Sequence, residues 1–386
     1  MMARLGDVCT VISGSTPKTS VTEYWDGDIK WITPAELNED SFYLYDSQRH
    51  ITELGKEKTG LAYMPIGTVI LSSRAPIGKT AIAGCEMCCN QGFKNLICSD
   101  DIFNEYLYYF LKGKTDYLNS LGRGATFKEI SKTIVENIEI SLPSLEEQKQ
   151  IAKQFEEIYR LISLRKQQLT KLDELVKARF VELFGSLNDN EKGLDIVSIE
   201  ELCTLIKDGT HQTPTYTEDK QNGFKFLSSK DVMTQKICWD DIKYIPAELH
   251  EKLYATIQPQ RNDILMSKNG VNYGVAAVND TDEIFDIYVS LALLRPRTDM
   301  VNPVYLRCVI NNPDTKRQFD SSIKGIGVPN LHLGEIKKTK VLLPPIEKQN
   351  EFVAFVEQTD KSKLAIQQSL DKLETLKKSL MQKYFR

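Results

Sequence analysis

The sequence predicts an α+β protein made of two duplicated domains, each followed by one long helix. A stretch that reads as a continuous helix occurs twice, at residues 142–184 and 343–385, and the two copies align without a gap. The regions before the helices also resemble each other. They contain short apolar runs rich in Val, Ile, Trp and Phe, separated by Gly, Pro, Asn and Asp, which is typical of strands and turns.

The duplication is clearest in the two helical stretches. Leu142 matches Leu343 and Phe184 matches Phe385, both at an offset of 201 residues. Each copy begins with a proline, has Glu and Gln in its first turn, and then contains neither Gly nor Pro. We therefore expect two uninterrupted helices, each roughly 60 Å long at 1.5 Å per residue.

Apolar residues form a narrow stripe along the first helix. They recur every seven positions, at Phe155, Ile162, Leu169, Val176 and Leu183. Such a stripe, flanked by Lys, Glu and Gln, needs another long helix as partner. The second copy has a similar stripe, interrupted at Thr359 and Lys363. We predict an intramolecular antiparallel coiled coil that relates the domains by a pseudo-twofold axis; the alternative is two helices packed separately on two cores.

The globular regions repeat more faintly. RLGDVCTVISGSTP at residues 4–17 resembles SIEELCTLIKDGTHQTP at 198–214, and PIGTVILSSRAPIGKTAIAG at 65–84 resembles QRNDILMSKNGVNYGVAAV at 260–278. Because the period is near 200 residues, the repeat indicates two domains of one fold rather than a solenoid. Each domain is expected to contain a curved, mostly antiparallel sheet plus helices.

The predicted boundaries follow from the helices and from the polar, Gly-bounded linker GSLNDNEKG at 185–193. Good helix patterns inside the domains occur only near 103–120 and 303–320. We expect domains at 1–142 and 187–343, and long helices at 143–186 and 344–386.

Composition limits the class of protein. A chain of 386 residues with 26% charged and 41% hydrophobic residues is expected to fold into two to three domains. The net charge of −4 does not exclude a local basic groove. The opening MMARLGDV lacks the apolar core of a signal peptide, and no apolar run is long enough to span a membrane, so we expect a cytoplasmic protein with reduced thiols.

Two patterns suggest ligand sites and are interpreted as structural. Cys85, Cys88 and Cys89 form a CxxCC cluster, but a second pair of zinc ligands is missing, so buried thiols are the better interpretation. The stretch at 75–80 ends in GKT like a phosphate-binding loop, but Ser73 stands where such a loop requires Gly. We predict a strand pair closed by a turn there.

Catalytic machinery is not apparent. The only Pro-Pro pair, at 344–345, lacks the polar and aromatic neighbours that adenine methyltransferases use to hold a flipped base. Asp314, Glu335 and Lys337 could be arranged around Mg²⁺, but so degenerate a pattern arises easily by chance. The four histidines are far apart in the sequence. We expect no catalytic residue and no metal site in this chain.

The order of these features resembles the specificity subunit of type I restriction-modification systems. The resemblance lies in the helix starts at Leu142 and Leu343, the RLGDVC and IEELCT openings followed by GSTP and GTHQTP, and the ILSSRAPIGKTAI stretch. It implies that the domains are DNA target-recognition domains. It also implies two modification subunits that methylate adenine with S-adenosylmethionine, and restriction subunits that use ATP and Mg²⁺, so that these cofactors belong to the partners.

Loops of both domains contain polar and cationic side chains near glycines. Arg and Lys can pair with guanine, Asn and Gln with adenine, and all can contact phosphates. The candidate DNA-binding residues are Ser15, Thr16, Lys18, Arg74, Lys79, Arg123, Lys128, His211, Gln212, Thr213, Lys230, Lys268, Asn269, Asn272, Tyr273 and Lys324. For any single one, an ordinary solvated loop residue is the alternative.

Two different readers joined by helices predict an asymmetric, bipartite DNA target with an unread spacer, whose length the helices set. The polar helix faces and apolar residues outside the seam are candidates for docking partner subunits: Leu161, Leu164, Phe180, Phe355, Thr359 and Lys363. The alternatives are a scaffold protein with two protein-binding domains, which would show no salt-dependent affinity for duplex DNA, and a self-sufficient nuclease.

Overall fold

The chain folds into two compact units. The computed structural model describes residues 1–74, 76–124, 128–323 and 329–385. Unit 1 comprises Met1–Gln167 and Gln367–Arg386, and unit 2 comprises Gln168–Ile366. Each unit therefore contains one globular region, the first part of one long helix and the last part of the other. None of the described helices is long and apolar enough to cross a membrane.

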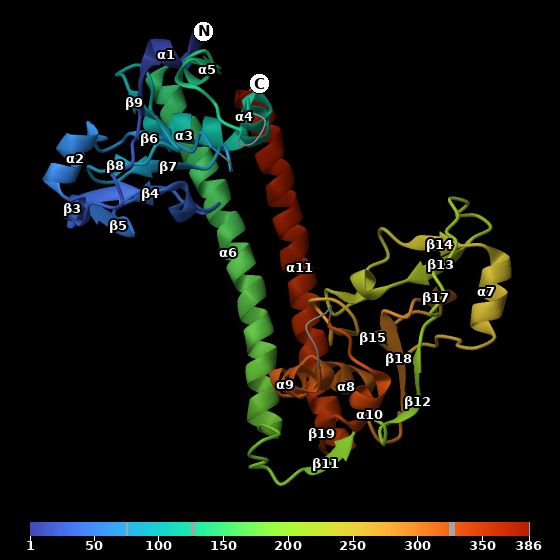
Figure 1. Cartoon of the computed structure of the whole chain (residues 1–386). Coiled ribbons are helices and arrows are strands. Elements are labelled where there is room, and N and C mark those ends of the chain that lie inside the picture. Colours follow the sequence, from blue (N-terminus) through green and yellow to red (C-terminus); the bar gives the residue numbers. More distant parts are fainter. Residues whose placement is uncertain (75, 125–127, 324–328, 386) are drawn as a thin grey trace. The chain divides into compact units, whose positions relative to one another are not determined.

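The globular region of unit 1 is built from short elements (Figure 1). Its strands are β1 (Met2–Arg4), β2 (Cys9–Ser13), β3 (Trp25–Ile32), β4 (Tyr43–Leu44), β5 (Arg49–Ile51), β6 (Val69–Leu71), β7 (Thr80–Ala83), β8 (Cys88–Cys89), β9 (Lys94–Cys98) and β10 (Glu139–Ser141). Its helices are α1 (Leu5–Val8), α2 (Glu53–Thr59), α3 (Asn104–Gly113), α4 (Thr115–Leu121) and α5 (Lys132–Glu136), with 3₁₀ turns η1 (Thr22–Tyr24) and η2 (Pro34–Glu36).

The strands of unit 1 form several small sheets. A five-stranded sheet has the order β2-β9-β6-β7-β4, a three-stranded sheet has the order β5-β3-β8, and β1 pairs with β10. Only the pairs β4–β7 and β3–β8 are parallel among these described strands. The prediction of mostly antiparallel strands is confirmed. Instead of one curved sheet, however, the strands are divided, because most are too short to extend across the whole domain.

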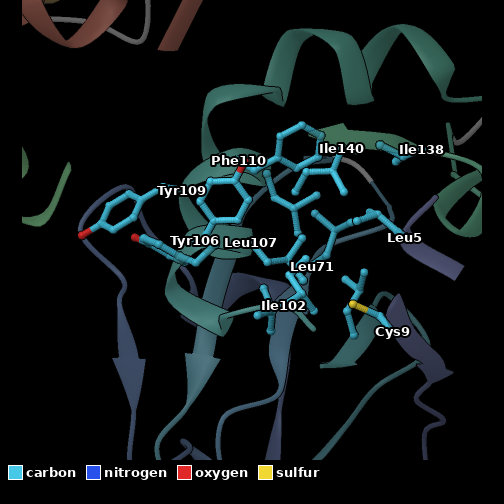
Figure 2. Close-up of a cluster of buried hydrophobic side chains, with 14 of the residues drawn as sticks. Leu5, Cys9, Leu71, Ile102, Tyr106, Leu107, Tyr109, Phe110, Ile138 and Ile140 are labelled. Atoms are coloured by element: carbon cyan, nitrogen blue, oxygen red, sulfur yellow. The ribbon is translucent and has the colours of Figure 1, made fainter. Parts of the chain in front are cut away.

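Helix α3 supplies much of the hydrophobic core of unit 1. Its residues Tyr106–Leu111 are all buried, which is typical of a helix covered on both sides. One side packs on β6 and β7. Figure 2 shows Tyr106, Leu107 and Phe110 gathered with Leu71 and other apolar side chains of this core.

Unit 2 repeats this order of elements. Its strands are β11 (Asp195–Ser198), β12 (Cys203–Asp208), β13 (Phe224–Leu227), β14 (Lys243–Ile245), β15 (Ile264–Ser267), β16 (Ala276–Val278), β17 (Phe285–Ile287), β18 (Leu291–Pro296) and β19 (Lys340–Leu343). Its helices are α7 (Ala247–Tyr254), α8 (Pro303–Ile310), α9 (Pro313–Ser322) and α10 (Leu333–Lys338), with the 3₁₀ turn η3 (Ser229–Val232).

The sheets of unit 2 correspond to those of unit 1, except that the larger sheet contains no described strand equivalent to β4. They have the orders β12-β18-β15-β16 and β14-β13-β17, with β11 paired to β19. The antiparallel pair β15–β16 corresponds to β6–β7, so the predicted strand pair at the GKT stretch is confirmed in both units. Helices α3 and α4, and α8 and α9, lie where the sequence predicted helices.

The two long helices are α6 (Leu145–Phe184) and α11 (Ile346–Tyr384). Helix α6 begins with a capping box, in which Ser144 N donates to Glu147 Oε2 at 3.0 Å and Glu147 N donates to Ser144 Oγ at 3.3 Å. It ends before Gly185, whose φ of 73° favours glycine.

The helices pair antiparallel inside each unit. In unit 1, Phe155 of α6 stacks on Phe385, which directly follows α11, at 5.3 Å between ring centroids. In unit 2, Phe180 of α6 contacts Phe352 of α11 at 5.5 Å. Early residues of one helix thus meet late residues of the other, as the coiled-coil prediction requires. The pseudo-twofold relation between the units stays a prediction.

The interruption of the second apolar stripe is accommodated. Thr359 is buried, and its hydroxyl donates to Phe355 O of the same helix at 2.9 Å. Lys363 donates a hydrogen bond to Asp173 on the facing part of α6. The stripe is therefore completed by polar groups that find partners within unit 2.

A buried glutamine fixes the start of each long helix. Gln148 Oε1 accepts from Phe103 N at 2.8 Å, and its Nε2 donates to Asp101 O and Pro143 O, both at 3.0 Å. Its counterpart Gln349 makes the equivalent three bonds in unit 2, at 2.9, 3.1 and 2.8 Å. Both side chains are 0% exposed, so all three bonds are shielded from water.

Replacing Gln148 by Leu is expected to destabilise unit 1. The change leaves an N–H and two carbonyls without a partner, at about 1–3 kcal/mol each, so we expect a loss of roughly 3 kcal/mol or more. Urea unfolding of the full chain measures it, with the exposed Gln167→Leu as control, expected to stay within about 0.5 kcal/mol. A Gln148→Leu chain as stable as the wild type would contradict the anchoring role.

Candidate DNA interface

A serine organises the loop between the paired strands in the same way in both units. Ser72 Oγ donates to Pro76 O at 2.8 Å and accepts a backbone N–H at 2.9 Å. Ser267 makes the equivalent bonds at 2.9 and 3.0 Å. The loops end at Gly78 and Gly274, whose φ angles of 94° and 88° favour glycine. The sequences between differ, but the loops are held alike.

The residue after this serine is fixed through its backbone. Ser73 N donates to Gly92 O at 2.7 Å, and Ser73 O accepts from Ile130 N at 2.9 Å. Lys268 is its counterpart in unit 2, and the two corresponding backbone bonds are both 2.9 Å long. The loop is therefore attached to two neighbouring segments in each unit.

The next position faces a fixed partner residue. Arg74 forms an antiparallel bridge with Glu129, and Asn269 forms the same bridge with Asn330. Glu129 and Asn330 are themselves equivalent, at the 201-residue offset of the duplication. One position of the fold thus presents a charged pair in unit 1 and two amides in unit 2.

Glu129 lies between two cations in unit 1. Its carboxylate is 2.8 Å from Arg74 Nε and 3.1 Å from Nζ of the buried Lys94. Burial acts to raise the pKa of Glu129, but the hydrogen bonds from Arg74 and Lys94 outweigh it and hold the pKa below the ordinary value for a glutamate. The carboxylate is therefore ionised at neutral pH and orients both cations.

Unit 2 keeps a buried ammonium but supplies it from another position. Lys268, 4% exposed, lies 2.5 Å from Asp208 Oδ1, and His211 Nε2 lies 3.5 Å from Asp208 Oδ2. Strand pairing places Ala292 where unit 1 has Lys94. The buried cation is thus on a strand in unit 1 and on a loop in unit 2, and its carboxylate partner also comes from a different position.

The side chain of Asn269 is incompletely bonded. Its Oδ1 is buried and accepts no hydrogen bond from any residue that the structure describes. A buried acceptor without a partner is costly, which makes such groups informative about binding.

Three other candidates of unit 1 lie on the loop after β2, and two of them, Ser15 and Thr16, are hydrogen-bonded within the protein. Ser15 N donates to Cys89 O at 3.0 Å, and Thr16 Oγ1 donates to the side chain of Gln91. Lys18 is exposed. Since Gly92 holds the Ser73 backbone, residues 89–92 connect this loop to the Ser72 loop.

The remaining candidates of unit 1 differ in availability. Lys79 Nζ donates to Leu37 O at 2.6 Å, so its ammonium is committed to the protein. Arg123 and Lys128 are exposed, and Arg123 exchanges two backbone hydrogen bonds of 3.0 Å with Glu129. The structure therefore brings Arg74 and Arg123 to the same carboxylate residue.

In unit 2, His211, Gln212 and Thr213 are all exposed on the loop after β12. Lys230 is exposed but donates to Asp241 O at 2.7 Å and to its Oδ2 at 3.0 Å. The loop after β12 and the Lys268 segment meet at Asp208, whereas the ammonium of Lys230 is held elsewhere.

Tyr273, a candidate DNA-binding residue, is 9% exposed; its hydroxyl donates to Asp320, and Lys316 Nζ lies 3.4 Å from its ring centroid. Asn272 is exposed. Lys324 lies outside the described residues.

The expected partner-docking residues are also divided. Phe180 was expected to be exposed, but it is 7% exposed and stacks on Tyr305 at 6.0 Å, because α6 buries this face against the core of unit 2. Leu161 and Phe355 are half-buried, and Leu164 is 40% exposed.

The residues that could have suggested a magnesium or zinc site make other contacts in the structure. Asp314 Oδ2 accepts from Leu187 N at 2.9 Å, while Lys337 pairs with Glu200 at 3.0 Å. Among the described residues, no group of three or more His, Cys, Asp or Glu side chains is placed to hold a metal ion. Burial raises the pKa of Cys88 to about 11 and that of Cys89 to about 12, which keeps both thiols protonated.

Sequence reasoning missed Lys94, Glu129, Asp208 and Asn330. A lysine and an aspartate at the ends of otherwise apolar strands were available signals for Lys94 and Asp208. Glu129 and Asn330 gain significance only from the bridge to the Ser72 and Ser267 loops, which links residues far apart in the sequence.

A duplicated α+β domain with matched but chemically different polar loops, attached to paired long helices, defines a two-part recognition protein. The chain belongs to the family described as "Type I restriction modification DNA specificity domain", whose model matches residues 1–174 and 191–377. Its function is to provide DNA sequence specificity, and a scaffold without a DNA role is not favoured.

Relatives of known class agree. The chain is 30% identical over 374 residues to the type I restriction enzyme MjaIX specificity subunit of Methanocaldococcus jannaschii, covering 92% of this chain and 85% of that protein. It is 22% identical over 326 residues to the type I restriction enzyme EcoBI specificity subunit of Escherichia coli, covering 77% and 68%.

Solved structures share the fold. The S subunit of a type I restriction-modification system from M. genitalium aligns with a TM-score of 0.59 at 14% identity, covering 100% of this chain and 96% of that one. A chain from a structure titled for complex assembly and conformational transition of the type I R-M system aligns with a TM-score of 0.61 at 19% identity, covering 100% and 97%.

Replacing Glu129 by Gln is expected to destabilise unit 1 in a pH-dependent way. The pKa of Glu129 is lower in the folded than in the unfolded chain, so its stabilising effect is present above about pH 4.3 and is lost as the pH falls through the folded value. Urea unfolding should show a lower midpoint for the variant at about pH 7 and a smaller difference at about pH 3.

The exposed Glu218→Gln serves as control, with no comparable change between the two pH values. A Glu129→Gln effect that is the same at both pH values would contradict the ionic contribution.

Proposed function

We propose that the chain reads an asymmetric, bipartite DNA target, with one half-site for each domain and an unread spacer between. The observation that supports this most strongly is the matched position at Arg74 and Asn269. It is held by the same backbone bonds in both units, yet it presents a guanidinium in one and an amide in the other. Since arginine and asparagine favour different bases, the two half-sites are different.

The groups that contact DNA are proposed to surround this position. In unit 1 they are Arg74, Arg123 and Lys128, and in unit 2 they are Asn269 and the exposed loop at 211–213. The first set is cationic and suits phosphates as well as guanine, whereas the second is mostly neutral and suits base edges. Lys94 and Lys268 are proposed to support these groups without contacting DNA, because each lysine is buried in an ion pair.

The chain is proposed to contribute recognition and assembly rather than catalysis. It would bind two modification subunits that use S-adenosylmethionine, and restriction subunits that use ATP and Mg²⁺, in the cytoplasm. Leu164, with the half-buried Leu161 and Phe355, is a candidate contact on the helices. The length of the helices would set the unread spacer.

Sequencing of methylated bases in cells that express the chain with its modification subunit tests the bipartite target. We expect one gapped motif, methylated on both strands, whose two halves differ. A palindromic motif without a gap would contradict the proposal.

Incubation of the purified chain alone with supercoiled plasmid and Mg²⁺ tests the absence of catalysis. We expect intact plasmid, because the carboxylates Asp314 and Glu335 make separate contacts within the protein. Cleavage that disappears in an Asp314→Asn variant would instead identify a nuclease.

A further inference from the structure

Arg74 and Asn269 occupy one position of the duplicated fold, and that position follows two residues fixed by hydrogen bonds. The two residues before it are held by hydrogen bonds from side chain and backbone, and the position itself bridges to a neighbouring segment. Positions that read a base need such rigidity, because a bidentate hydrogen bond tolerates little displacement.

The guanidinium of Arg74 is oriented by one hydrogen bond, and its other donors remain available. Its Nε donates to Glu129 Oε2 at 2.8 Å, while the side chain remains 45% exposed. The terminal nitrogens donate to no acceptor among the described residues. A planar fork bonded to a carboxylate through Nε keeps its two terminal nitrogens as donors, and such a pair of donors can bind O6 and N7 of guanine.

Stabilisation of the fold by the ion pair with Glu129 does not explain the presence of Arg74. Exposed ion pairs contribute little, and Glu129 already has a second, buried cationic partner in Lys94. Without Arg74 the carboxylate would therefore still be neutralised. Lys94 satisfies the structural requirement, which leaves Arg74 free for another role.

Asn269 presents complementary chemistry at the same place. Its Oδ1 has no hydrogen-bond partner among the described residues, and its bridge partner is the exposed Asn330. Its buried Oδ1, without a partner among the described residues, would gain one if the side chain turned toward a base edge. Adenine offers the matching pair, since its N6 donates to Oδ1 and its N7 accepts from Nδ2.

We propose that Arg74 and Asn269 are specificity-determining residues, and that Arg74 reads one guanine in the half-site of unit 1 while Asn269 reads one adenine in the half-site of unit 2. This rests on the proposed bipartite function. Under this proposal, one position of the fold, occupied by Arg74 in unit 1 and Asn269 in unit 2, determines one base pair in each half-site.

Reciprocal substitution tests the assignment. The full chain in complex with its modification subunit is mixed with random-sequence duplex DNA, and the bound DNA is sequenced. Arg74→Asn should change one position of one half-site from G toward A, and Asn269→Arg should change one position of the other half-site from A toward G. We expect a preference change of roughly 10- to 100-fold at that position and none elsewhere.

Two conservative variants guard against misfolding. Arg74→Lys keeps the charge but loses the fork, and Asn269→Asp keeps the shape but loses the donor, so each should weaken preference at the same single position. Arg261→Asn is the matched control, because Arg261 pairs with Asp282 at 2.7 Å near the opposite end of β15. It should leave the bound motif unchanged.

The outcomes separate the two proposals. A wild-type complex that selects no sequence would overturn the bipartite function and this inference with it. A wild-type complex that selects a bipartite motif, which the Arg74 and Asn269 variants select unchanged, would overturn only the base assignment. Variants that lose affinity for all sequences alike would also overturn it, since phosphate contact rather than base reading would then explain the side chains.

Discussion

The buried amides of Gln148 and Gln349 are the contacts on which the rest of the structure depends. Each binds the backbone of the domain before it and fixes the point where a long helix leaves that domain. The helix ends are fixed by aromatic residues: Phe385 packs on Phe155 in unit 1, and Phe184 packs on Phe352 in unit 2. Each unit is thus held to the start of one helix and the end of the other, so neither globular region is a freely tethered domain.

The two units share the backbone of their loops but differ in the side chains that the loops expose. Because Ser72 and Ser267 hold their loops through hydrogen bonds to the backbone, the side chains that follow can differ without altering the loop. The buried ammonium is an example: Lys94 of β9 pairs with Glu129 in unit 1, whereas Lys268 of the loop after β15 pairs with Asp208 in unit 2. A duplicated fold with this property can acquire two specificities without redesigning its core.

Local pattern predicted the long helices, their antiparallel pairing and the strand pair at the GKT stretch. These features depend on periodicity, proline and glycine, which are visible along the chain. The burial of Phe180 was not predictable, because the apolar stripe alone does not show that the end of α6 packs on Tyr305 and on the core of unit 2. Nor was the pairing of Arg74 with Glu129, because it joins segments 55 residues apart. The sequence therefore predicted only part of the candidate site. It indicated the loop, but not the residues that pair with it, such as Lys94 and Glu129.

Each unit is proposed to read its own half-site. The most direct test of this separate reading is a chain made of two tandem copies of residues 1–186. Each copy retains Gln148 at the start of its long helix and Phe184 at its end. Expressed with the modification subunit, this chain should direct methylation to a motif that contains the unit 1 half-site twice, as found by sequencing methylated bases. A motif that still contains the half-site assigned to unit 2 would contradict the account.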